Sequence, residues 1–200
     1  WNKDQGYDTA LEACEKSLAR LDCGYIDLYL IHWPLKDLRN DSWKAFIELQ
    51  KRGLCRSIGV SNFTIDNLKE LEEKYDVLPA INQVEFHPYH YQKELLEYCN
   101  SKNIIIEAYS PLVHAKRMDE PRLMAISDEL GKTPAQVLIR WAIQRGMVVL
   151  PKSVNQDRIV ENFAVFDFDI SNSLMKRLDD LDERYVTCWD PHNPPPYAPV

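Results

Sequence analysis

Residues 25–31, YIDLYLI, form a short run of aliphatic and aromatic side chains, and the polar residue His32 follows at once. Four later runs have the same character. The predicted strands are Tyr25–Ile31, Ser57–Val60, Ile81–Phe86, Ile104–Tyr109 and Val148–Leu150. Because apolar and polar residues do not alternate strictly in these runs, we expect strands that are covered on both faces, as in a parallel sheet.

The stretches between these runs have the periodicity of amphipathic helices, with apolar residues three and four positions apart, as in residues 11–21. A later helix is predicted to begin at residues 133–136, where TPAQ combines a capping box with proline at the first helical position. Gly53, Gly131 and Gly146 lie just past predicted helix ends, where a left-handed residue is favoured.

The regular alternation of strand and helix predicts an α/β fold with a parallel sheet and right-handed crossovers. No linker or internal sequence repeat interrupts the pattern. We therefore expect a single domain over residues 1–200. Its tail, residues 185–200, is rich in proline and aromatic residues and is predicted to be a loop laid over the domain.

Composition excludes several classes of protein. The chain has 200 residues, is 45% hydrophobic and carries a net charge of -7, and its lysines and arginines are scattered. A nucleic-acid binder would show a basic stripe. No apolar run approaches the roughly 20 residues of a membrane-spanning helix, and no basic-then-apolar segment predicts a secretory leader. We expect a cytoplasmic protein without nucleic-acid or membrane partners.

The cysteines are odd in number and widely spaced, and no CxxC pair suggests a zinc or redox site. We expect reduced, mostly buried thiols and no metal centre. The cysteines are Cys14, Cys23, Cys55, Cys99 and Cys188.

Every predicted strand has polar residues at its carboxyl end. The strand ends are His32, Ser61-Asn62, Glu85-Phe86-His87, Tyr109-Ser110 and Lys152-Ser153. Strands that repeatedly end in hydrogen-bonding residues are typical of an active-site rim, because ligands bind beyond the carboxyl ends of parallel strands.

The segment LPKSVNQDRIVEN, residues 150–162, combines a strand end with a helix start. We expect an anion site at this helix amino terminus, formed by Lys152, Ser153 and Arg158. The free N–H groups and the helix dipole at such a terminus also favour negative charge. Charge-assisted bonds from Arg158 suit a terminal phosphate. The alternative is that Lys152 and Arg158 are ordinary solvated surface charges.

The GxGxxG, GxSxG, HExxH and GxxxxGK[ST] motifs are all absent, so a doubly wound dinucleotide fold is not supported. In contrast, five blocks in this order resemble the signature segments of the aldo-keto reductase superfamily, in its small microbial, plant and prostaglandin-F-synthase-like branch. The blocks are YIDLYLIHWP, RSIGVSNF, INQVEFHP, EAYSPL and LPKSVNQDRIVEN. The resemblance implies a (β/α)8 TIM barrel, of which the chain carries roughly the last five βα units.

The resemblance also implies NADPH-dependent reduction of aldehydes and ketones to alcohols. It places Ser61, Asn62 and Gln83 at the nicotinamide carboxamide and Tyr109 against the nicotinamide ring. The remaining implied cofactor contacts are Ser110 and Leu112 along the pyrophosphate, Lys152, Ser153 and Arg158 at the 2′-phosphate with Val154 nearby, and Glu161 and Asn162 at the adenine.

His32 matches the active-site histidine of the family, and a neutral imidazole there would donate a hydrogen bond to the substrate carbonyl. His87 is interpreted as structural, and His90, His114 and His192 as loop or surface residues. Trp33 and Trp189 are predicted to line an apolar substrate pocket, although Trp33 suits core packing equally well.

The catalytic tyrosine, lysine and aspartate of the family would precede Trp1. We therefore expect the chain to be part of an enzyme of roughly 280 residues, monomeric as is common in this branch. Two alternatives remain. One is a non-catalytic, dinucleotide-binding relic. The other is a (β/α)8 enzyme of unrelated chemistry, because one fold hosts many reactions.

Overall fold

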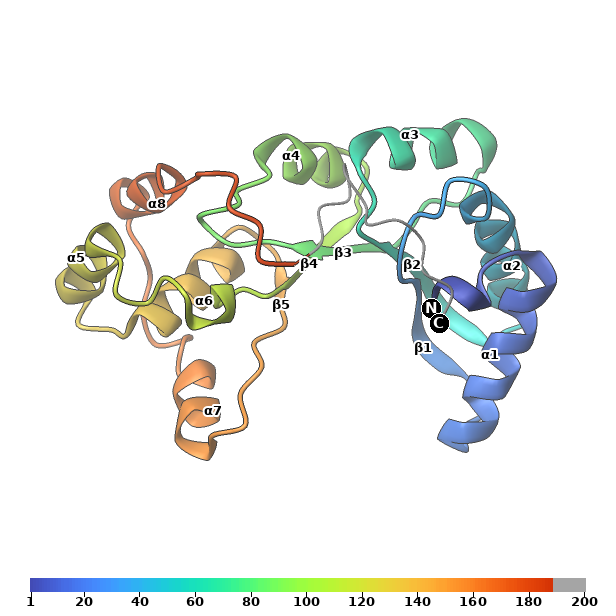
Figure 1. Ribbon diagram of the computed structural model, residues 1–200, viewed down its shortest axis with the longest axis horizontal. Coiled ribbons are helices and arrows are strands. Elements are labelled where there is room, and N and C mark those ends of the chain that lie inside the picture. The colour runs from blue at the N-terminus through green and yellow to red at the C-terminus, as the bar shows by residue number, and fades with distance from the viewer. Residues whose placement is uncertain (189–200) are drawn as a thin grey trace. The chain divides into compact units, whose positions relative to one another are not determined.

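The computed structural model describes residues 1–188, in which strands alternate with helices (Figure 1). The strands are β1 (Ile26–Ile31), β2 (Cys55–Ser61), β3 (Ile81–Glu85), β4 (Ile105–Tyr109) and β5 (Val148–Val149). The α-helices are α1 (Tyr7–Leu21), α2 (Arg39–Lys51), α3 (Ile65–Lys74), α4 (Lys93–Ser101), α5 (Pro121–Leu130), α6 (Pro134–Gln144), α7 (Gln156–Phe163) and α8 (Asn172–Asp179). Short 3-10 turns lie at η1 (Asn2–Asp4) and η2 (Val113–Ala115).

The strands form one sheet in the order β1-β2-β3-β4-β5, and the described pairings are parallel. Because parallel neighbours run in the same direction, their carboxyl ends share one edge. The predicted α/β class and the parallel sheet are confirmed.

The chain divides into two compact units. Within the described residues, the first comprises Trp1–Gln83 and Glu97–Ile104, and the second comprises Val84–Leu96 and residues 105–188. The boundaries fall within β3, within α4 and directly before β4. That the whole of residues 1–200 behaves as one domain stays a prediction.

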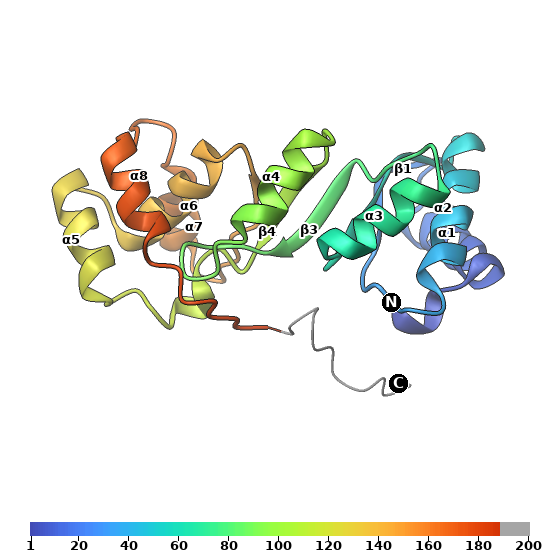
Figure 2. The ribbon, with the colours of Figure 1, turned by 90° about the horizontal axis from the view of Figure 1, so that it is seen from above.

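The core of the first unit lies where α2 packs on α1 and on the strands β1 and β2 (Figure 2). Trp43 and Leu49 of α2 are fully buried, and Cys14 of α1 is buried with them. The Trp43 indole N–H donates to the Val77 carbonyl oxygen at 3.0 Å, which satisfies its one polar atom. These helices form because their buried residues recur at helical spacing.

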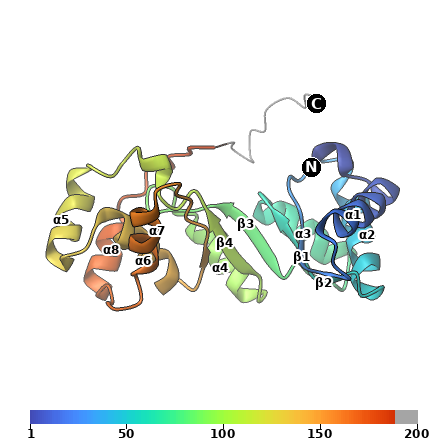
Figure 3. The same cartoon turned by 90° about the horizontal axis from the view of Figure 1, so that it is seen from below.

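The second unit is organised around α6, which contacts α5, α7 and β5 (Figure 3). Trp141 of α6 is fully buried, with ring centroids 6.0 Å from Phe86 and 5.4 Å from Tyr91. Its indole N–H donates to the Asp179 carboxylate of α8 at 2.9 Å. Trp141 therefore packs against two aromatic rings and also connects α6 to α8 by a hydrogen bond.

The predicted start of α6 is confirmed in detail. The Thr133 hydroxyl accepts the Gln136 N–H, the Gln136 side chain accepts the Thr133 N–H, and Pro134 is the first helical residue. Gly53 and Gly131 adopt φ values of 74° and 60°, which a residue with a Cβ atom rarely adopts. Local sequence chemistry thus sets the ends of these helices.

No helix in the described part of the chain is both long enough and apolar enough to span a membrane.

A network around Glu70 joins α2 to α3. The Glu70 carboxylate accepts bonds from Lys74 at 2.7 Å, Asn40 at 2.8 Å and Arg39 Nε at 2.9 Å. The bond from Lys74, followed by those from Arg39 and Asn40, outweighs partial burial and lowers the pKa of Glu70 to about 2. Folding therefore favours the ionised carboxylate.

We predict that Glu70→Gln lowers the free energy of unfolding by about 1 to 2 kcal/mol at pH 7. Because the pKa of Glu70 is depressed on folding, this stabilisation is present above the ordinary value of 4.5 and is lost as the pH falls towards 2. Urea unfolding at pH 7 and at pH 3 measures the difference. Glu73→Gln, an exposed position on the same helix, is the control. Equal stability of both variants at pH 7 would contradict the network's role.

Candidate functional site

In the first unit, parallel pairing brings the ends of β1, β2 and β3 together. Ile31 is opposite Val60, and Ser61 is opposite Gln83. The residues that follow these positions therefore lie at one edge. The predicted residues His32, Ser61, Asn62 and Gln83 all belong to this edge.

Hydrogen bonds fix the cluster. The Asn62 side-chain amide donates to the His32 carbonyl oxygen at 3.0 Å, and the Asn62 backbone N–H donates to the Gln83 carbonyl oxygen at 2.9 Å. The Ser61 hydroxyl donates to the same Gln83 oxygen at 2.8 Å. Asn62 adopts φ 63°, a left-handed conformation that asparagine tolerates better than most residues.

Asn82 supports this turn, and the sequence alone did not identify it. Its side chain is fully buried, donates to the Phe63 carbonyl oxygen at 2.9 Å and accepts the Phe63 N–H at 3.3 Å. The signal available was a polar residue inside an apolar strand, which must find partners when buried. Asn82 therefore holds the backbone that follows Asn62.

The His32 ring lies 4.7 Å from the Trp1 ring, centroid to centroid. Although the residue is exposed by surface area, neighbouring atoms desolvate the ring and lower the pKa of His32. The imidazole is therefore neutral at pH 7 and has one N–H to donate. The next residue, Trp33, is 7% exposed, and its carbonyl oxygen accepts the Gln5 amide at 2.7 Å.

In the second unit, β4 and β5 pair with Ala108 opposite Val149. Tyr109 ends β4, and burial raises the pKa of its phenol, so the hydroxyl keeps its proton at neutral pH. The loop that follows has unusual backbone geometry. Ser110 has φ 50°, and the three residues of η2 have φ values of 53°, 51° and 61°. Strain of this kind in a β-branched residue such as Val113 is often found at functional sites.

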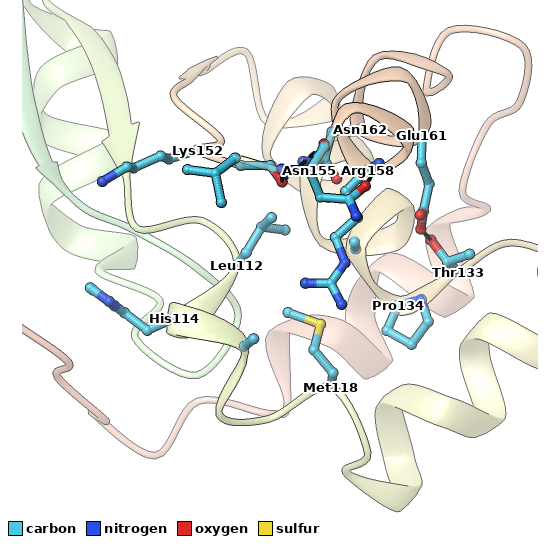
Figure 4. A pocket seen from close by; sticks show the side chains of 14 residues that line it. Leu112, His114, Met118, Thr133, Pro134, Lys152, Asn155, Arg158, Glu161 and Asn162 are labelled. Atoms are coloured by element: carbon cyan, nitrogen blue, oxygen red, sulfur yellow. Dashed lines mark hydrogen bonds between the residues drawn. The ribbon is translucent and has the colours of Figure 1, made fainter.

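A pocket of about 630 Å³ lies between this loop and the start of α7 (Figure 4). All of its lining residues belong to the second unit. They are Leu112, His114, Ala115, Met118, Thr133, Pro134, Ala135, Lys152, Ser153, Val154, Asn155, Arg158, Glu161 and Asn162.

The start of α7 determines the chemistry of the pocket. The Asn155 side chain accepts the Arg158 N–H at 3.0 Å, and the Ser153 hydroxyl accepts the Asn155 N–H at 3.1 Å. Within residues 1–188, Lys152 and Arg158 form no salt bridge, although both line the pocket. Two cations beside a helix amino terminus make the pocket suitable for an anion.

The opposite wall of the pocket comes from the start of α6. Glu161 of α7 accepts a hydrogen bond from the Thr133 hydroxyl, which ties the two helices together on this side. Thr133, Pro134 and Met118 were not predicted as site residues. The TPAQ motif indicated only a helix start, and nothing in the sequence distinguishes Met118.

The structure therefore places the predicted residues in two groups. Seven of them line the pocket: Leu112, Lys152, Ser153, Val154, Arg158, Glu161 and Asn162. The strand-end cluster of the first unit contains His32, Ser61, Asn62 and Gln83. Tyr109 and Ser110 lie in the second unit and are not among the lining residues, and Trp189 lies outside the described residues.

His87 is buried, and its Nε2 atom lies 3.1 Å from Glu85 Oε1. Glu85 also accepts N–H groups from Thr187 at 2.8 Å and Cys188 at 3.0 Å, and a bond from the Thr187 hydroxyl. These bonds lower the pKa of Glu85 to about 2 despite the opposing effect of burial. Such an arrangement is consistent with a structural His87. In the described residues, no group of three or more potential ligands could hold a metal ion.

Comparisons with known proteins agree with one another. The model of the aldo/keto reductase family matches residues 1–183. The chain is 49% identical over 186 residues to glyoxal reductase of Bacillus subtilis (strain 168), covering 92% of this chain and 67% of that protein. It is 45% identical over 196 residues to 9,11-endoperoxide prostaglandin H2 reductase of Trypanosoma cruzi (strain CL Brener). That match covers 96% of this chain and 69% of the relative.

Among solved structures, the chain resembles a Bombyx mori aldo-keto reductase in complex with NADP. The TM-score is 0.86 at 33% sequence identity, covering 93% of this chain and 67% of that one. The chain spans about two thirds of the length of the curated relatives that it matches. The family match and the level of identity lead to one conclusion: the chain belongs to the aldo/keto reductase family.

Proposed function

We propose that this protein reduces aldehydes and ketones to alcohols with NADPH. The observation that carries the proposal is the pocket at the start of α7, where Lys152 and Arg158 face a cavity without a carboxylate partner in the described residues. The reductase names of the relatives and the NADP of the Bombyx mori structure support the same activity.

The residues of the pocket fit a phosphorylated dinucleotide. Two cations that form no ion pair within residues 1–188, together with the N–H groups of a helix start, suit a 2′-phosphate, because charge-assisted bonds are strongest where donors are already oriented. We assign this phosphate to Lys152, Ser153 and Arg158, with Val154 beside it. Glu161 and Asn162 are assigned to the adenine.

The remaining assignments rest on family membership together with local geometry. Ser110 and Leu112 are proposed to lie along the pyrophosphate, and Tyr109 against the nicotinamide ring. The carboxamide is assigned to Ser61, Asn62 and Gln83. Bound NADPH supplies a hydride to the carbonyl carbon, and orientation by these residues lowers the barrier by holding the reactants in place.

His32 is proposed to donate a hydrogen bond from its neutral imidazole to the substrate carbonyl oxygen. Desolvation by neighbouring atoms lowers the pKa of His32, which keeps the ring uncharged at physiological pH. A fixed donor near the oxygen orients the carbonyl and stabilises the negative charge that develops there. Trp33 and Trp189 are proposed as apolar walls for the substrate.

We further propose a monomer that works in the cytoplasm on small molecules. The net charge of -7 and the scattering of lysines and arginines along the sequence argue against a nucleic-acid partner.

We expect the protein to consume NADPH when it is mixed with small aldehydes, ketones or α-dicarbonyl compounds, glyoxal among them. Loss of NADPH absorbance and formation of an equal amount of alcohol measure the reaction. Tight NADPH binding without turnover of any such compound would instead support the dinucleotide-binding relic.

Arg158→Ala is expected to raise the Kd for NADPH by about 10-fold to 100-fold, because one to three kcal/mol of charge-assisted bonding is lost. The Kd for NADH should change much less, since NADH has no 2′-phosphate. Fluorescence titration with both cofactors measures the difference. Arg20→Ala, an exposed arginine of α1, is the matched control. Equal losses for NADPH and NADH would remove the phosphate assignment.

His32→Ala is expected to lower kcat/KM for an aldehyde by about 100-fold or more while the Kd for NADPH stays within about twofold. The substitution spares the turn, because Asn62 bonds to the His32 backbone oxygen and not to its ring. His32→Gln, which keeps an N–H donor, should lose less. Steady-state kinetics of the three proteins provide the measurement, and an unchanged kcat/KM in His32→Ala would disprove the role.

A further inference from the structure

Three nucleophilic or basic side chains meet beside the pocket, all within the second unit. Cys188 Sγ lies 3.5 Å from His114 Nε2. The Ser110 hydroxyl oxygen lies 3.0 Å from the same nitrogen and 3.4 Å from the sulfur. Cys188 is exposed, so its thiol is open to reagents in solution.

The backbone holds both partners in place. The Cys188 N–H donates to Glu85 at 3.0 Å, the Thr187 N–H donates to it at 2.8 Å, and the Tyr185 N–H donates to the Tyr89 carbonyl oxygen at 2.8 Å. On the other side, His114 is the middle residue of the left-handed turn η2, with φ 51°. Thus the imidazole and the thiol meet because two separate segments are each fixed.

We propose that Cys188 is a nucleophilic thiol that His114 activates, and that this site takes α,β-unsaturated carbonyl compounds. The thiolate is the reactive form of cysteine, and an adjacent imidazole can accept the thiol proton. With the proton on Nε2, the imidazolium bonds to Ser110, and the Ser110 hydroxyl donates to the thiolate sulfur. Serine therefore completes a short relay between base and nucleophile.

The chemical class of the electrophile follows from the balance of the reaction. The thiol proton moves to His114 Nε2, and the sulfur forms a bond to the β-carbon as the carbon–carbon double bond becomes an enolate. The imidazolium then returns the proton to the α-carbon. The net change is addition of S–H across the double bond, with no oxidant and no leaving group. This addition needs a thiolate and a nearby acid, which Cys188 and the protonated His114 would supply.

His114 lines the pocket, so its imidazole is accessible from the cavity (Figure 4). The charged or titratable groups near the thiol include the Glu85 carboxylate, which bonds to the Cys188 backbone, and the Tyr109 phenol. The negative charge of the Glu85 carboxylate disfavours a thiolate at Cys188. The thiolate therefore depends on an ion pair with the His114 imidazolium. Removing the imidazole should therefore remove most of the reactivity.

The other cysteines provide internal controls. Cys14, Cys55 and Cys99 are buried, and burial raises the pKa of Cys55 and of Cys99 to about 12. Cys23 is exposed like Cys188 but has no side-chain partner among residues 1–188. Cys23 thus reports the reactivity of an ordinary surface thiol in the same molecule.

The test is competitive labelling of the full protein with limiting N-ethylmaleimide at pH 7, followed by mass spectrometry of the peptides. We expect Cys188 to react about tenfold or more faster than Cys23. Equal rates at the two cysteines would overturn the proposal without any variant.

His114→Asn is the matched variant, because asparagine tolerates the left-handed backbone and lacks the imidazole. We expect the rate at Cys188 to fall to that of Cys23, while the rate at Cys23 and the circular dichroism spectrum stay unchanged. A Cys188 rate that survives this substitution would show that His114 does not activate the thiol. The measurement does not depend on NADPH, so its failure would leave the proposed reductase activity untouched.

Discussion

Parallel hydrogen bonding between neighbouring strands decides which side chains meet at the strand ends. In the first unit, Ser61 is opposite Gln83 and Ile31 is opposite Val60. A shift by one residue would turn each following side chain to the other face. The cluster of hydrogen bonds around Asn62 therefore depends on a register that the apolar side chains of the strands stabilise.

In the second unit, the parallel pairing of β4 with β5 likewise positions the residues between the end of β5 and the start of α7. The strand end brings Lys152 and Ser153 to the point where Asn155 caps the helix, and Arg158 follows after one turn. The pocket thus combines side-chain charge with free backbone N–H groups. In the described residues, neither Lys152 nor Arg158 forms a salt bridge with a carboxylate. The pocket therefore suits an anionic ligand.

Glu85 has a different role, since its carboxylate connects the end of β3 with the segment at residues 187–188. Four hydrogen bonds to one buried acceptor keep it ionised, because each donor stabilises the charge that burial would otherwise disfavour. One consequence is that Cys188 is fixed opposite His114. A structural carboxylate therefore positions a thiol whose chemistry is separate from the proposed carbonyl reduction.

The sequence by itself determined the strands and the starts and ends of several helices, because these features depend on short-range periodicity and capping. The start of α6 at Thr133 is an example. Half of the residues that line the pocket were also predicted, through the resemblance to a known family. Helix α8 was not anticipated. Only the tertiary structure brought Met118 and Thr133 into the pocket and Cys188 to His114, 74 residues away in the chain. Such contacts between distant residues depend on the path of the chain in three dimensions, and no local sequence pattern predicts that path.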